Sequence, residues 1–332
     1  MRKAWLAAGE VSALVERAVG GVLSSEMTLV VFGSLARGEW TVGSDLDWTL
    51  LIDGQVDPKH LEVTQHLAAK LGSLRYAGKQ IQRPGIEGTF GNMAFSHPIV
   101  HHIGGESDTN RNVTQRILLL SESKPIGVSD AHDRVVKAVL SRYVGDQPGL
   151  MTGASREGVP RFLLNDVVRY WRTVTVDFVY KRRARGGKGA GLRNIKLRLS
   201  RKLLFTAGLL HCFLGSRFWL QGDPDSHTAV ETMLDVVRQN TPLDRLAVTI
   251  EAFNIPDETA REILGSYDEF LGLIDDEETR KRFDELPLDE LQSDSAFLKA
   301  KEIGDRFDQG LKRMFFDGPD ELKAFTREYG IF

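Results

Sequence analysis

Apolar positions change their period along the chain, and this change divides the sequence into two parts. Residues 10–23 repeat apolar side chains at intervals of three and four, which is the period of a helix. Residues 28–35 and 46–53 are short apolar runs that predict strands, the second ending at the turn-forming Asp53-Gly54 pair. Residues 58–74 open with a proline and predict another helix. The first part of the chain is therefore expected to mix helices with strands.

Beyond about residue 155 the helical period dominates and strand patterns nearly vanish. The longest helix-periodic segments are residues 161–181, 192–214 and 227–250. Residues 145–160 are dense in glycine, proline and small polar side chains, as expected at a domain boundary. We therefore predict two domains, residues 1–150 and residues 151–332, the second mostly helical.

Composition narrows the class of protein without defining it. A chain of 332 residues usually needs more than one compact core. Its 42% hydrophobic and 27% charged residues are ordinary for a globular protein, and a net charge of −3 gives no overall attraction to nucleic acid or membrane. The single cysteine, Cys212, excludes an internal disulfide framework and suits a reducing compartment. Glu10 and Glu16 interrupt any secretory signal, so we expect a cytoplasmic protein that does not bind membranes.

The candidate chemistry lies around the turn between the two predicted strands. Asp45 and Asp47 are one residue apart, so on a strand both side chains project from the same face. Adjacent carboxylates repel each other, and Mg²⁺ relieves that cost because it is commonly held by one or two carboxylates together with substrate phosphates. Gly33 and Ser34 end the preceding strand, where the backbone and a hydroxyl can bind phosphate oxygens closely. We predict a metal and nucleotide-phosphate site here.

The order Gly33-Ser34, Arg37-Gly38-Glu39, Ser44-Asp45-Leu46-Asp47 resembles the signature of the DNA polymerase β-like nucleotidyltransferase superfamily. Its pieces are most similar to PII-uridylyltransferase and related nucleotidyltransferases, over about residues 28–53. The resemblance implies an α+β fold, in which a catalytic domain with a small mixed sheet is followed by a mostly α-helical domain. It also implies that Asp45 and Asp47 hold Mg²⁺, with Mn²⁺ as an alternative, and that substrate is bound by Gly33, Ser34 and Arg37.

Enzymes of this superfamily use a third carboxylate on a neighbouring strand. Glu122 is the favoured candidate, because it is expected at a strand end after the apolar residues 117–120, although residues 113–123 fit either a strand or a short helix. Glu87 and Asp108, in the loop-rich residues 83–110, are the alternatives. Each of the three could instead be an ordinary surface acid.

The helical half offers candidate partners for phosphate. The helix predicted over residues 161–181 has a polar face, either solvated or lining a cleft, formed by Asp166, Arg169, Tyr170, Thr173, Asp177 and Lys181. On the next helix one face carries Arg193, Lys196 and Ser200, and in related enzymes a lysine and a serine on such a helix hold the triphosphate. Arg198, Arg201 and Lys202 are expected to point elsewhere. We predict one deep interdomain cleft between Gly33, Ser34, Asp45 and Asp47 on one wall and Lys196 and Ser200 on the other.

Together these features predict a Mg²⁺-dependent, ATP- or other NTP-binding nucleotidyltransferase that moves a nucleoside monophosphate to an acceptor hydroxyl and releases pyrophosphate. The acceptor stays open between a protein, an RNA, a small molecule and a second nucleotide, although the basic residues 181–188 hint at a polyanion. The alternative is a catalytically silent nucleotide- or RNA-binding module on the same fold. Release of pyrophosphate that depends on Mg²⁺ would separate the two.

Overall fold

Four strands form a mixed sheet in the order β5-β2-β1-β6 in the computed structural model of the chain. β1 (Met27–Val31) runs antiparallel to β2 (Trp48–Ile52) and to β6 (Lys124–Ile126), whereas β5 (Asn92–Phe95) runs parallel to β2. The structure describes residues 1–85, 89–145, 158–219 and 226–330. The small mixed sheet and the helical segments that follow it confirm the predicted α+β class.

The two faces of the sheet pack against different helices. Leu29 and Val31 of β1 and Leu50 of β2 join a core with α1 (Arg2–Val19) and α3 (Lys59–Leu71). Val30 and Leu51 face the opposite side, which is covered by α4 (Ser96–His101), α5 (Asn110–Ser121) and α6 (Asp130–Gly145). Because both faces are buried, the strands read as continuous apolar runs rather than alternating ones. A separate hairpin pairs β3 (Arg75–Tyr76) with β4 (Lys79–Gln80).

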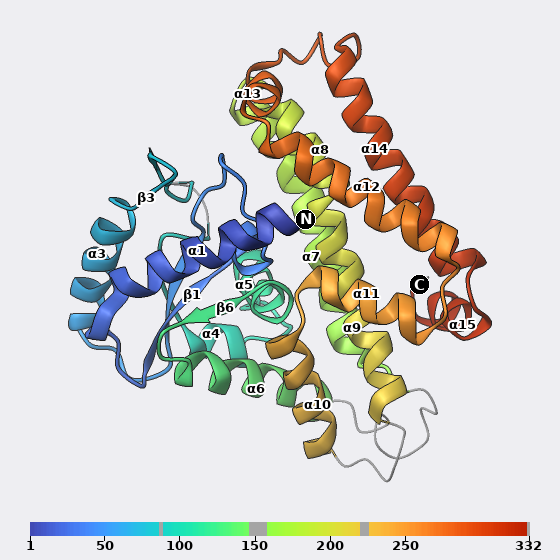
Figure 1. Cartoon of the computed structure of the whole chain (residues 1–332). Coiled ribbons are helices and arrows are strands. Elements are labelled where there is room, and N and C mark those ends of the chain that lie inside the picture. Colours follow the sequence, from blue (N-terminus) through green and yellow to red (C-terminus); the bar gives the residue numbers. More distant parts are fainter. Residues whose placement is uncertain (86–88, 146–157, 220–225, 331–332) are drawn as a thin grey trace.

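The second half of the chain is a set of helices beside the sheet-containing half (Figure 1). They are α7 (Arg161–Ala184), α8 (Ala190–Arg198), α9 (Ser200–Trp219), α10 (Ser226–Gln239), α11 (Pro242–Ala252), α12 (Asp257–Asp275), α13 (Glu277–Glu285), α14 (Ser295–Lys312) and α15 (Asp320–Tyr329). One hydrophobic core runs from Val30 in the sheet to Phe325 in α15, so the two halves share their packing. The boundary expected within residues 145–160 falls largely on residues outside the described ranges, and the two-domain division stays a prediction.

Several local expectations need correction. The segment predicted as one helix over residues 192–214 is divided at Leu199, whose backbone leaves the helical region (φ −118°, ψ −82°) while its side chain is fully buried. Of the two alternatives for residues 113–123, the structure shows the helix, α5, and residues 83–110 contain β5 and α4 besides the expected loops. Tyr170, expected on a polar face, is 4% exposed and belongs to the core. Each correction reflects packing between elements, which overrides local preference.

Every helix in the described ranges is too short or too polar to cross a bilayer.

Candidate functional site

The turn after β1 is built around Gly33, which begins the short helix α2 (Gly33–Ala36). Gly33 has φ +65°, and a Cβ placed on it would lie 2.9 Å from Oδ2 of Asp47. The Phe32 amide donates a hydrogen bond to the Asp47 carbonyl at 2.9 Å. A side chain at position 33 would therefore be strained and would collide with the carboxylate, which explains the glycine.

Ser34 follows in α2, and its hydroxyl makes no hydrogen bond to any residue that the structure describes. Its backbone carbonyl accepts from the Glu39 amide at 2.8 Å, so a main-chain bond closes the turn at this residue. The hydroxyl is consequently available to a ligand.

Asp45 and Asp47 lie in the extended segment that leads into β2, where Asp45 forms an isolated bridge with Gln82. Neither carboxylate has an ionic partner among the described residues. Burial raises the pKa of Asp47 to about 8, and the negative charges of Asp45 and Glu122 act in the same direction, against Lys196 and Arg201. The raised pKa favours the protonated form of Asp47, and a cation bound between the two carboxylates would favour the ionised form.

This donor set fits a divalent cation completed by substrate. Across the described ranges, no group of three or more His, Cys, Asp or Glu side chains is arranged to hold a metal ion. Two neighbouring carboxylates nevertheless suit Mg²⁺, which is commonly held by one or two carboxylates, several waters and phosphate oxygens. Asp45 and Asp47 are the residues that would hold it.

Three cations from the helical half, Lys196, Arg201 and Arg280, lie near enough to this acidic position to interact electrostatically with it. Burial lowers the pKa of Lys196 on α8, Asp45 and Asp47 oppose that shift, and the positive charges of Arg280 and Arg201 add to it. Lys196, Arg201 and Arg280 form no ion pair with a described carboxylate. Carboxylates from one half and cations from the other, all without an ionic partner among the described residues, therefore lie near one another. The interdomain cleft stays a prediction.

Two of these cations were missed by reasoning from the sequence. Arg201 was expected to point elsewhere, but the break at Leu199 starts a new helix, and Arg201 acts on both Asp47 and Glu122. Arg280 comes from α13, where its NH1 lies 3.4 Å from the Thr41 hydroxyl. Nothing in the sequence near Arg280 indicates this contact, because α13 reaches the Thr41 loop only through tertiary packing.

The other two predicted phosphate ligands, Ser200 and Arg193, each donate a hydrogen bond to a backbone carbonyl of the protein. Ser200, the first residue of α9, is 6% exposed. Its hydroxyl donates to the carbonyl of Lys196 in α8 at 3.1 Å, so the hydroxyl proton is already used within the protein. Arg193 donates from NH2 to the Lys188 carbonyl, while its buried Nε has no partner among the described residues. Arg193 lies near enough to Arg185 and Arg201 for their positive charges to lower its pKa, in addition to the effect of burial.

The Arg-Gly-Glu motif, residues 37–39, is part of a buried cluster of ion pairs and is not exposed for binding substrate. Arg37 donates from Nε to Glu39 at 2.7 Å and from NH1 to Glu122, and all three side chains are at most 10% exposed. The Tyr267 hydroxyl of α12 donates to Glu39, 3.0 Å from each carboxylate oxygen. This geometry holds the turn against the helical half and leaves Arg37 little freedom to bind substrate.

Glu122 was expected at a strand end, and this placement was wrong: it caps the C-terminus of helix α5. Burial raises its pKa, and the charge of Arg37 opposes that shift. It lies close enough to influence Asp47 yet is already paired, so its role as a third metal ligand stays a prediction. Of the alternatives, Asp108 is tied to Arg116 and Arg169 away from the turn, and Glu87 lies outside the described residues.

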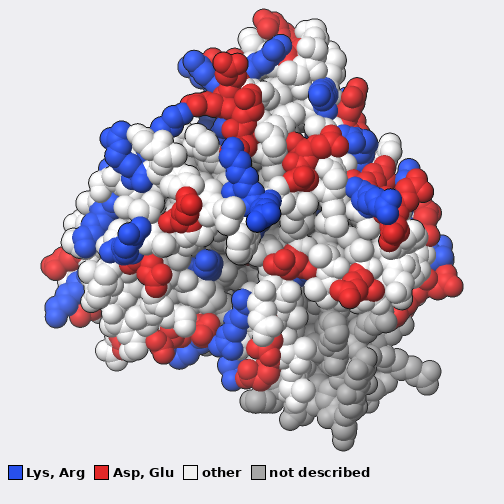
Figure 2. All heavy atoms as spheres, in the orientation of Figure 1, with Lys and Arg blue, Asp and Glu red and all other residues white. Residues whose placement is uncertain are grey.

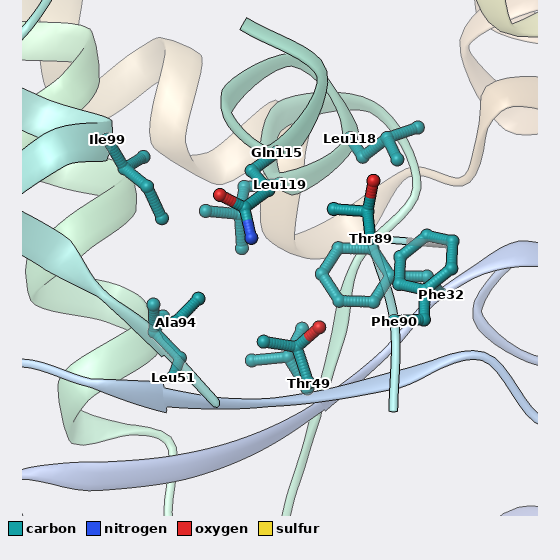
Figure 3. A pocket seen from close by; sticks show the side chains of 11 residues that line it. Phe32, Thr49, Leu51, Thr89, Phe90, Ala94, Ile99, Gln115, Leu118 and Leu119 are labelled. Atoms are coloured by element: carbon teal, nitrogen blue, oxygen red, sulfur yellow. The ribbon is translucent and has the colours of Figure 1, made fainter. Parts of the chain in front are cut away.

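A small cavity lies beneath the sheet between β1, β2 and α5 (Figure 3). It has a volume of about 10 Å³, close to the least space that holds one water. Apolar side chains surround it, and the Gln115 amide points toward it with Nε2 unpaired among the described residues. The cavity is too small to bind a nucleotide.

The glycine turn, both aspartates and the strands β1 and β2 lie in a part of the chain that matches a known family model. Residues 7–83 match the family model described as putative nucleotidyltransferase DUF294. This match supports the nucleotidyltransferase-like family and includes Gly33, Asp45 and Asp47, but neither Glu122 nor the helical half. A comparison with curated proteins found no match.

Proposed function

We propose that this chain transfers a nucleoside monophosphate from an NTP to an acceptor hydroxyl and releases pyrophosphate. The observation that carries the proposal is that two carboxylates, Asp45 and Asp47, lie near three cations from α8, α9 and α13, and that none of the five has an ionic partner among the described residues. A metal–triphosphate complex needs both environments within one molecule's length. The family match over residues 7–83 supports the same reaction class.

In the proposed reaction, the acceptor oxygen forms a bond to the α-phosphorus as the bond to the pyrophosphate oxygen breaks. The acceptor proton passes to solvent, and pyrophosphate leaves. Lys196, Arg201 and Arg280 would neutralise the negative charge on the β- and γ-phosphates, and the two arginines can bind phosphate in a forked geometry. Gly33 lets the backbone approach a phosphate, and Ser34 offers a free hydroxyl.

Asp45 and Asp47 would hold the Mg²⁺ ions, for which Mn²⁺ could substitute. Bound metal supplies charge neutralisation and lowers the pKa of the attacking hydroxyl. The acceptor can be a protein, an RNA, a small molecule or a second nucleotide, and each leaves a different labelled product.

The test is incubation of the protein with each α-labelled NTP and Mg²⁺, with pyrophosphate measured and the label sorted into protein, RNA and small-molecule fractions. We expect Mg²⁺-dependent pyrophosphate release that Asp45→Asn and Asp47→Asn abolish. Glu62→Gln, an exposed acid on α3, is the matched control and should retain activity. Binding of NTP without any pyrophosphate release, across all acceptor fractions, would instead establish the silent binding module.

A further inference from the structure

Helices α12 and α13 contact the segment between the glycine turn and the aspartate pair, residues 39–44, which form the Thr41 loop. Three side chains of these helices bond to it. The contacts are Tyr267 with Glu39 at 3.0 Å, Asp275 with the Val42 amide at 3.3 Å, and Arg280 with the Thr41 hydroxyl at 3.4 Å. The loop that leads into Asp45 is therefore held by helices more than 200 residues farther along the chain.

Within this loop, residues 41–44 form a turn that is closed on itself. The Ser44 amide donates to the Thr41 carbonyl at 2.9 Å, and the Thr41 amide donates to the Ser44 hydroxyl at 3.1 Å. Gly43 lies in this turn, but its φ is outside the left-handed region that favours glycine. The backbone conformation alone does not explain why position 43 is a glycine.

Packing against Arg280 does explain it. A Cβ placed on Gly43 would lie 2.6 Å from Cδ and 2.9 Å from Cζ of Arg280, closer than real Cβ contacts. The end of the Arg280 side chain thus occupies the space that any side chain at position 43 would need. Glycine lets the guanidinium lie directly against the backbone of the loop.

Arg280 keeps donors that a ligand can reach. Its Nε and NH2 make no hydrogen bond to a described residue, and neither is among the unpaired nitrogens that the protein encloses. Burial lowers the pKa of Arg280, and the negative charges of Asp45 and Asp284 oppose that shift. No ion pair joins Arg280 to either acid. Arg280 is therefore a cation near Asp45 with accessible N–H groups.

Charge at the surface does not by itself distinguish this arginine. Figure 2 shows acidic and basic side chains interspersed over the face of the molecule in view. Arg282, two residues farther along α13, donates to Asp294 at 2.8 Å. What distinguishes Arg280 is that its guanidinium rests on a glycine in the loop that precedes Asp45.

We propose that Gly43 is a positioning residue, whose missing side chain lets the Arg280 guanidinium lie beside Asp45 and bind the phosphates of an NTP. This inference rests on the proposed function. The atoms that an alanine at position 43 would meet belong to the end of a flexible side chain. Alanine should therefore displace Arg280 and leave the backbone in place, so that a phosphate contact is lost at little cost in stability.

The test measures binding of inorganic tripolyphosphate with Mg²⁺ to the full chain by titration calorimetry. Gly43→Ala and Arg280→Ala should each weaken binding roughly tenfold or more, as expected for a lost charge-assisted contact. The double variant should bind no more weakly than Arg280→Ala, because the atoms that collide with the alanine are then gone. Chemical unfolding of Gly43→Ala should keep the wild-type midpoint, which separates displacement of Arg280 from general damage to the fold.

Two matched controls should bind tripolyphosphate like the wild type. Gly272→Ala adds a Cβ on α12 where it meets no atom within 4 Å, and Arg282→Ala removes the neighbouring, paired arginine. Unchanged affinity in Gly43→Ala would overturn the positioning role, as would a further loss when Gly43→Ala is added to Arg280→Ala. A wild-type chain that binds no tripolyphosphate would also overturn it.

The same variants separate this inference from the proposed reaction. Pyrophosphate release that Gly43→Ala leaves unchanged would overturn the positioning role while the transfer reaction stands. Tripolyphosphate binding with the expected non-additive losses, but without pyrophosphate release from any NTP, would support the role of Gly43 and overturn the transfer reaction.

Discussion

The basic residues at the candidate site differ from their neighbours on α8 and α9 in having no ionic partner among the described residues. Arg198 pairs with Asp305 at 2.9 Å and Lys202 with Asp308 at 2.5 Å, both across to α14. Lys196 and Arg201, interleaved with them in sequence, have no such partner among the described residues and act on Asp47 instead. A cation held near an acid without direct pairing is suited to bind an intervening phosphate.

The first prediction concerns the metal ligands. Mg²⁺ should raise the unfolding temperature of the wild-type protein, because an ion that binds only the folded state stabilises it. Asp47→Asn should remove this increment, since it removes one of the two unpaired carboxylates. Thermal unfolding with and without Mg²⁺ measures this rise in unfolding temperature, and the control variant Glu62→Gln should show the same rise as the wild type. An increment of equal size in Asp47→Asn would exclude Asp47 as a ligand.

The second prediction concerns the triphosphate. Lys196→Ala should weaken NTP binding by about 1.5–3 kcal/mol through loss of a charge-assisted contact. Lys202→Ala, which removes the same side chain from the neighbouring helix, should change NTP affinity little because Lys202 is paired with Asp308. Titration calorimetry on both variants decides the point. Equal affinities for the two variants would show that Lys196 does not bind the nucleotide.

At the scale of elements, a buried polar network joins α5, α6 and α7. Arg116 of α5 donates to Asp108 at 2.9 Å, to Asp166 of α7 at 2.7 Å and to the Tyr143 hydroxyl of α6 at 2.7 Å. Arg116 and the Asp108 side chain are fully buried. The network fixes the first helix of the helical half against the helices that cover the sheet, and so it positions the two walls of the site.

The third prediction follows from that burial. Asp108→Asn should lower the free energy of unfolding by about 3–5 kcal/mol, because it removes one of the two carboxylates that pair with the buried Arg116. Asp53→Asn, which breaks the more exposed pair with Arg134, should cost less than about 1 kcal/mol. Denaturant titrations of both variants give the comparison. Similar losses of unfolding free energy in Asp108→Asn and Asp53→Asn would contradict a structural role for the network.

The fourth prediction concerns how the stability that Asp108 contributes depends on pH. Burial opposes ionisation of Asp108, but hydrogen bonds from Arg116 and the Gly104 amide, with the charges of Arg116 and Arg169, lower its pKa below the ordinary value of 3.8. The unfolded chain therefore takes up a proton first as pH falls. The stability that Asp108 contributes is fully present above pH 3.8 and is lost below it. The difference in unfolding temperature between wild type and Asp108→Asn should accordingly narrow in acid.

At the scale of the whole molecule, the two halves share one hydrophobic core and are linked at the surface by weaker contacts. Val30, Leu51 and Ala94 of the sheet belong to the same cluster as the helices from α7 to α15. The exposed links are the ion pairs of the Met1 amino group with Asp268, Lys3 with Asp275 and Lys79 with Glu277. Such exposed pairs are worth little, so the shared core holds the halves together.

The fifth prediction is a single cooperative unfolding transition, in which the calorimetric and van't Hoff enthalpies agree. Lys79→Ala should leave that transition unchanged, because it removes one exposed link only. Differential scanning calorimetry tests both statements. Two resolved transitions would show that the halves fold as independent domains.

Sequence reasoning located what depends on local geometry. The glycine at the turn and the two aspartates one residue apart are constrained within a few residues, so their pattern indicated the acidic position that the structure contains. Long helix-periodic segments likewise predicted helices, because a helix needs only neighbouring residues to satisfy its backbone. Short segments such as β6, three residues long, carry too little pattern to be recognised.

Only the tertiary structure decided which distant groups meet. Arg280 of α13 and Tyr267 of α12 reach the turn through packing of helices far along the chain, and no local pattern encodes that approach. Glu122 forms an ion pair with Arg37 because both side chains are buried, and a buried charge is costly without a partner of opposite charge. Arg201 lies near Asp47 because the helix is interrupted at Leu199. Burial of the Leu199 side chain in the core outweighs the local preference for an unbroken helix.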